Sequence, residues 1–160
     1  MIYFAYGSNM SEQRLCARIP AAMRVAVGVL SGHQLKFHKQ GMDDSAKCNI
    51  WSSGNAEDKV FGVLFEIPDT GKVTLDGYEG PGYQAVMLDI RTEQGVLSAL
   101  AYSALKIDAE LKPYDWYKEH VLRGARENRL PEQYIQQIEA VASISDPDRE
   151  RHRKEMAIYD

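Results

Sequence analysis

Near the start of the chain lies the segment Ile2-Tyr3-Phe4-Ala5-Tyr6-Gly7-Ser8-Asn9. Its first four residues are apolar or aromatic and predict a short buried strand, which Gly7 then breaks. Asn9 and Ser11 are both good helix N-caps, and Glu12 follows Asn9 at the spacing of a capping box. The segment therefore predicts a strand, a tight turn and a short helix in close succession.

Short strands dominate the first two thirds of the chain. In the strongest of them, residues 60–67, alternate side chains suit the two faces of a sheet. Turn residues at 31–32 and at 93–95 predict two hairpins, each joining two consecutive strands. The predicted strands are 2–5, 25–30, 34–39, 48–51, 60–67, 83–90 and 96–102.

The last third of the chain changes character. Residues 113–125 and a segment that starts near Arg129 predict helices, and an earlier helix should begin at Pro68 and end at Gly77. Strands followed by helices, without strict alternation, indicate an α+β domain. Five to seven short strands suggest a curled sheet or a small barrel with helices outside.

Composition and charge exclude several classes of function. The 160 residues suit one domain over 1–144, followed by a charged C-terminal tail over 145–160, which we expect as a solvated helix or a frayed end. The net charge is −4, so no basic excess exists to bind nucleic acid. No apolar run is long enough for a membrane, and no signal peptide is visible. The two cysteines, Cys16 and Cys48, predict free thiols in a cytoplasmic protein. The four scattered histidines match no metal spacing.

Two segments carry residue types that suit chemistry. At the first turn, Gly7 lets the backbone approach a ligand, and the N–H groups of a helix start favour a carboxylate or phosphate. The second segment is Leu75-Asp-Gly-Tyr-Glu79-Gly-Pro-Gly-Tyr83, in which an acid lies among glycines. Partly shielded by tyrosines, that carboxyl would have a raised pKa and act as a base and then an acid. Taken singly, each segment is better explained as a helix cap or a solvated turn acid.

Together, the two segments resemble the γ-glutamylcyclotransferase-like family, also called AIG2-like. A third block agrees, and the resemblance covers most of the chain. It implies a mixed β-barrel with flanking helices, and an enzyme that releases an amine or amino acid from a γ-glutamyl compound as 5-oxoproline forms. It implies no cofactor and no metal. The blocks that carry it are Tyr-Phe-Ala-Tyr-Gly-Ser-Asn at 3–9, Leu-Asp-x-x-Glu-Gly at 75–80, and Tyr117 to Val121, Gly124 to Asn128 and Leu130-Pro131-Glu-x-Tyr134.

The resemblance also assigns roles. Glu79 matches the general acid/base, Tyr102 a further substrate contact, and Tyr83 a tyrosine that often follows the catalytic loop. The glutathione-specific branch has an apolar residue where this chain has Asn9, so glutathione is a less suitable substrate and the leaving group stays open. The substrate-binding segment comprises Tyr3, Phe4, Ala5, Tyr6, Gly7, Ser8 and Asn9.

This chemistry fits the residue types. The α-amine of a γ-glutamyl group attacks its own γ-carbonyl, so holding the chain folded supplies much of the rate. One carboxyl can take the ammonium proton and later protonate the leaving nitrogen. Backbone N–H groups beside Gly7 can hold a carboxylate or the developing oxyanion.

Two other functions stay open. One is a non-catalytic or regulatory protein that binds the small molecule without turnover. The other is a thiol enzyme that uses Cys48 with His38, although a buried structural cysteine explains Cys48 more simply. The tail arginines would suit either solvent or a second subunit, so a homodimer is a further open alternative.

Overall fold

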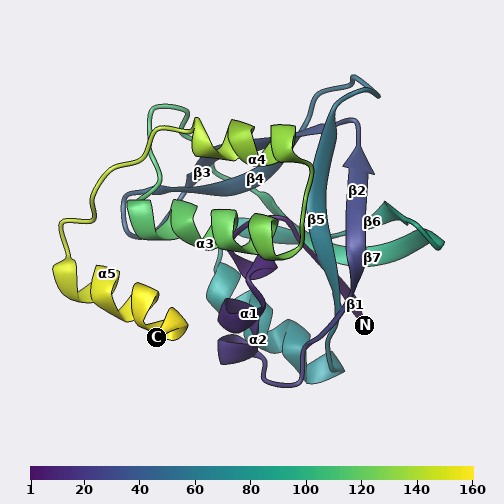
Figure 1. The fold of residues 1–160 in the computed structure, drawn as a ribbon, viewed down its shortest axis with the longest axis horizontal. Helices are drawn as coiled ribbons and strands as arrows, with labels where there is room; N and C mark the ends of the chain where they lie inside the picture. Colours follow the sequence, from purple (N-terminus) through teal and green to yellow (C-terminus); the bar gives the residue numbers. More distant parts are fainter.

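Five strands close into a barrel in a computed structural model that describes residues 1–160 (Figure 1). The barrel order is β1-β5-β2-β6-β7. β1 pairs antiparallel with β5 but parallel with β7, so the barrel is mixed, as expected from the sequence. The barrel strands are β1 Ile2–Ala5, β2 Met23–Ser31, β5 Lys59–Glu66, β6 Tyr83–Thr92 and β7 Gly95–Ala104.

The remaining strands, β3 His33–Gln40 and β4 Ala46–Ser52, form a separate two-stranded sheet. The predicted hairpin between residues 25–30 and 34–39 is therefore wrong. The reason is that β2 already has barrel neighbours on both edges, so the chain leaves the barrel at Gly32, which has a φ of 77°. The second predicted hairpin is confirmed, because β6 and β7 pair continuously from Tyr83 opposite Ala104 to Thr92 opposite Gly95.

The helices lie to one side of the barrel, and the β6–β7 hairpin projects from the other side (Figure 1). No helix is both long and apolar enough to cross a membrane. A one-turn 3-10 helix, η1 Ser8–Met10, follows β1, and a second, η2 Ala157–Tyr159, ends the chain. The longer helices are α1 Glu12–Arg18, α2 Asp69–Glu79, α3 Asp115–Glu127, α4 Glu132–Glu139 and α5 Arg149–Met156.

The structure selects one of the two predicted caps of α1 and extends α2 beyond its predicted end. Ser11, not Asn9, caps α1, because its side chain accepts a hydrogen bond from the Arg14 backbone N–H. The α2 helix runs past Gly77 and ends at Gly80, whose φ of 69° suits a helix C-terminus. Glu79 is consequently the last residue of a helix rather than a loop residue.

The turn after β1 is held against α3. A Cβ on Gly124 of α3 would lie 2.5 Å from the Cβ of Met10, so only glycine permits this approach. Asn128 closes the contact, because its Nδ2 donates to the carbonyl oxygens of Met10 and Gly124. The position of η1, and with it the Gly7 turn, is thus fixed by the third helix.

Candidate functional site

A cavity of about 260 Å³ lies where the Gly7 turn, the end of α2, β3, β4 and α3 meet. Its lining comes from segments that are far apart in the sequence. The structure therefore brings together the two segments that the sequence marked for chemistry. Eight of the ten predicted site residues line this cavity: Tyr3, Tyr6, Gly7, Ser8, Asn9, Glu79, Tyr83 and Tyr102.

Phe4 and Ala5 do not line the cavity. Both are fully buried in the hydrophobic core. A Cβ on Gly62 of β5 would lie within 2.7 Å of the Phe4 ring, so the absent side chain makes room for that ring. Within the first motif these two residues pack against the barrel, while their neighbours face the cavity.

Glu79 is the acidic residue of the cavity that is best suited to act as a general acid or base. It is half-buried, and its pKa is raised because burial penalises the charged form. Arg18, Lys39 and Arg14 oppose that rise through their positive charge. No protein group donates a hydrogen bond to the carboxylate, so it is free to exchange protons with a ligand.

The Gly7 turn offers backbone and side-chain donors to the same cavity. The N–H of Gly7 makes no backbone hydrogen bond in the protein. A Cβ on Gly7 would lie 3.1 Å from the Cβ of Cys48 and 3.3 Å from the hydroxyl of Tyr117, which favours glycine here. Ser8 adds a hydroxyl to the lining. These groups suit an anionic oxygen.

The Asn9 side chain makes hydrogen bonds to two neighbouring residues of the cavity. Its Nδ2 donates to the Tyr3 hydroxyl at 3.1 Å, and its Oδ1 accepts from Arg18 Nη1 at 3.1 Å. Both bonds are internal, and the side chain is buried. Asn9 thus holds an aromatic and a basic residue of the cavity in place.

The remaining predicted tyrosines form walls. The Tyr102 hydroxyl donates to Asp76 at 2.6 Å, and the Tyr6 hydroxyl donates to the Tyr102 carbonyl. The Tyr83 hydroxyl donates to the Cys48 carbonyl at 2.5 Å. Because these hydroxyls already have partners, the rings shape the cavity and exclude water from it.

Sequence reasoning missed the basic residues of the cavity. Arg14 and Arg18 lie one turn apart on α1, a spacing that places them on one helix face and was a usable signal. Lys39 gave no signal, since a lysine at the end of a predicted strand is ordinarily solvated. Its ammonium makes no protein hydrogen bond and lies 4.4 Å from the centroid of the Tyr83 ring. Lys39 is buried as a residue, but its unpaired ammonium is not among the buried unpartnered atoms, so it stays accessible and suits a carboxylate.

The thiol hypothesis fails on geometry. Cys48 lines the cavity, but His38 does not, and His38 Nε2 instead lies 3.0 Å from the Asn49 side-chain amide. Burial raises the pKa of the Cys48 thiol to about 12. A thiolate is therefore scarce near neutral pH, and His38 is not beside it to act as its base.

The burial of Cys48 predicts that its thiol is unreactive in the native protein. We expect iodoacetamide at pH 7.5 to leave Cys48 unmodified in the native protein and to label it after denaturation. Peptide mass spectrometry before and after denaturation would measure the difference. Rapid labelling of native Cys48 would contradict the burial described above.

Comparisons with known proteins agree with this architecture. Gamma-glutamylcyclotransferase of Homo sapiens is 28% identical over 150 residues, covering 88% of this chain and 78% of that protein. The Bos taurus protein of the same name is 27% identical over the same length and coverage. A solved structure of a gamma-glutamyl cyclotransferase shares the fold with a TM-score of 0.81 at 24% identity, covering 96% of this chain and 98% of that chain.

A family assignment follows from a third comparison. The sequence model of the AIG2-like family matches residues 59–138, which is half of the chain. The match runs from β5 to α4 and includes Glu79. The chain belongs to the AIG2-like family.

Proposed function

We propose that this protein is a cofactor-independent γ-glutamylcyclotransferase of the cytoplasm. It converts the γ-glutamyl group of a γ-glutamyl amine or amino acid to 5-oxoproline and releases the amine. The observation that carries the proposal is the unpaired Glu79 carboxyl in one cavity with the Gly7 turn. The names of the curated relatives support the activity. The absence of a disulfide at Cys16 and Cys48 supports the compartment.

The charges of the cavity suit a γ-glutamyl group. That group carries an α-carboxylate and an α-ammonium next to each other. In the proposed complex the Lys39 ammonium and the Gly7 N–H hold the carboxylate, and Glu79 accepts a hydrogen bond from the ammonium. The tyrosine walls keep the chain folded, so the nitrogen meets the γ-carbonyl carbon.

A single carboxyl group, that of Glu79, moves the protons in the proposed reaction. Glu79 takes a proton from the α-ammonium, and the freed nitrogen attacks the γ-carbonyl carbon to close the five-membered ring. The Ser8 hydroxyl and nearby backbone N–H groups stabilise the oxyanion. Glu79 returns its proton to the leaving nitrogen as the old C–N bond breaks. The ring nitrogen then loses its second surplus proton through the regenerated Glu79 carboxylate to the released amine, so the products are a neutral lactam and an ammonium, and the protons balance without a cofactor.

The direct test is an assay of the purified chain with γ-glutamyl-alanine. We expect stoichiometric 5-oxoproline and alanine by mass spectrometry. Calorimetric binding of several γ-glutamyl compounds without any product would contradict the enzyme and favour a binding protein.

The pH profile of kcat/KM reports on Glu79. The raised pKa means that the base ionises only above the ordinary glutamate range, so activity should fall on the acid side at an unusually high pH. Lys39→Met removes a positive charge that lowers this pKa, so the acid limb should move to still higher pH. The KM should also rise about tenfold, because a charged hydrogen bond to the substrate is lost. An acid limb that stays in place would contradict this assignment of Lys39.

A further inference from the structure

We propose that Asp76 is a positioning residue, which holds the Tyr102 hydroxyl so that its oxygen accepts a hydrogen bond from the α-ammonium of the substrate. The inference rests on the proposed cyclotransferase function and concerns the end of the cavity that holds Glu79. Recognition of the amine then depends on a carboxylate that does not itself line the cavity.

Asp76 lies in the last turn of α2, three residues before Glu79. That spacing makes the two carboxylates neighbours on the surface of the helix. Both oxygens of Asp76 are in use, because Oδ1 accepts from the Tyr102 hydroxyl at 2.6 Å and Oδ2 accepts from Lys72 Nζ at 2.7 Å. The Asp76 side chain is 44% exposed and lies outside the lining, so it binds Tyr102 from outside the cavity.

Tyr102 lies on β7 and lines the cavity. The hydrogen bonds to Lys72 and Tyr102 lower the pKa of Asp76, so Asp76 is ionised near neutral pH and can only accept. The hydroxyl proton of Tyr102 is therefore directed to Asp76. Its oxygen keeps its lone pairs, and no protein group donates a hydrogen bond to it. A ligand that meets this oxygen must be a donor.

The Tyr102 hydroxyl lies within electrostatic reach of Glu79. Burial, the hydrogen bond to Asp76 and the charge of Asp76 raise the pKa of Tyr102, and the charges of Tyr3 and Glu79 add to the rise. An ammonium has three N–H groups, so it can donate to the Glu79 carboxylate and to the Tyr102 oxygen at once. When Glu79 removes one proton, the hydrogen bond to Tyr102 keeps the nitrogen in position for the ring closure.

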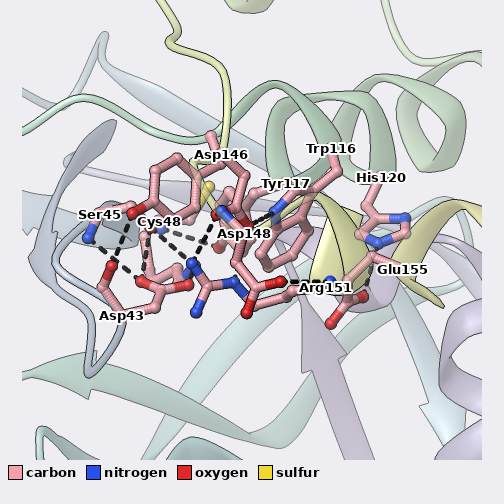
Figure 2. Close-up of polar contacts among 12 residues, drawn as sticks. Asp43, Ser45, Cys48, Trp116, Tyr117, His120, Asp146, Asp148, Arg151 and Glu155 are labelled. Atoms are coloured by element: carbon pink, nitrogen blue, oxygen red, sulfur yellow. Dashed lines mark hydrogen bonds and ion pairs between the residues drawn. The ribbon is translucent and has the colours of Figure 1, made fainter. Parts of the chain in front are cut away.

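The other two acids of the cavity are Asp43 and Glu155, whose contacts Figure 2 shows. Lys47 donates to Asp43 at 2.9 Å, and Arg14 pairs with Glu155. A substrate ammonium would have to displace a basic side chain from either of these carboxylates. The end of the cavity that holds Glu79 is therefore the end that suits the ammonium.

Two ligands that differ only at the α-nitrogen test the acceptor. They are γ-glutamyl-alanine and glutaryl-alanine, in which a hydrogen replaces the α-amine. Calorimetric Kd values are measured in the Glu79→Gln background, where the substrate is not consumed. We expect γ-glutamyl-alanine to bind at least about tenfold more tightly, because a charged hydrogen bond to Tyr102 is made only by this ligand.

Asp76→Ala removes the acceptor of the Tyr102 proton and introduces a residue that favours a helix. The hydroxyl can then turn its proton toward the ammonium, so the preference for γ-glutamyl-alanine should fall about fivefold. Tyr102→Phe removes the oxygen and should lower the preference by at least as much. Adding Asp76→Ala to Tyr102→Phe should change it by less than about twofold, because Asp76 acts through that oxygen. Asp89→Ala, at an exposed acid outside the cavity, is the matched control.

The outcomes separate the acceptor from the proposed function. If Asp76→Ala weakens both ligands alike, Asp76 only holds α2 against β7 and the inference is overturned. Equal affinities of the two ligands before Asp76 is changed would overturn it as well. These Kd values do not depend on turnover. If the wild type forms no 5-oxoproline, the proposed function fails, while a preference that is lost in Asp76→Ala still supports the acceptor.

Discussion

Glu79→Gln should abolish turnover while leaving the protein folded. The amide cannot accept the ammonium proton or return it, and the same carboxyl serves both steps. We expect kcat to fall by about 10³-fold or more, at the upper end of the range for a general acid–base residue. Stability should be equal or higher, because the variant removes a charge that is desolvated and lacks a hydrogen-bonding partner.

The measurement is 5-oxoproline release at saturating substrate, together with thermal unfolding. Glu66→Gln is the matched control, since Glu66 is an exposed acid outside the cavity and the same isosteric change should leave kcat unchanged. A Glu79→Gln variant with kcat within tenfold of the wild type would remove Glu79 from the mechanism. A loss of activity that parallels a loss of folded protein would likewise fail to support a catalytic role for Glu79.

Gly124→Ala should destabilise the protein and damage the site at a distance. The new Cβ would lie 2.5 Å from the Ser11 backbone nitrogen and 2.6 Å from the Met10 carbonyl carbon. Backbone atoms cannot move aside as a flexible side chain can, so α3 and η1 must separate. We expect a loss of about 1–3 kcal/mol in the free energy of unfolding. We also expect a lower kcat/KM, because the Gly7 turn is anchored through this contact.

Gly77→Ala makes the same chemical change as a control. Gly77 lies within α2, and nothing lies within 4 Å of an added Cβ. Alanine favours a helix over glycine, so this variant should gain up to about 1 kcal/mol. Urea denaturation of both variants measures the contrast. Equal stabilities for Gly124→Ala and the wild type would show that α3 does not fix the turn.

Local patterns predicted most of the elements correctly. The strand over 60–67 and the hairpin between β6 and β7 depend on alternation and turn residues that are contiguous in the sequence. The hairpin after Ser31 failed because strand pairing in a barrel is decided by which edges are already occupied. The strands that occupy the two edges of β2 are β5 and β6, which lie far along the chain, so the local sequence after Ser31 could not reveal them.

The site was predictable where motifs are contiguous. The Gly7 turn and Glu79 meet in one cavity, as the pairing of the two segments required. Lys39 and Lys47 lie opposite each other on β3 and β4, Glu155 lies on α5, and each is an ordinary charged residue in its local context. Their convergence is a property of the barrel, the two-stranded sheet and the tail helix together, so periodicity could not reveal it.

The central claim is that the Gly7 turn holds a γ-glutamyl group while Glu79 moves its protons. A crystal structure of Glu79→Gln with γ-glutamyl-alanine tests this most directly. The account predicts the α-nitrogen of the ligand within hydrogen-bond distance of the residue 79 side chain, and its α-carboxylate at the Gly7 N–H and Lys39. A ligand bound elsewhere, or one whose α-nitrogen points away from residue 79, would contradict it.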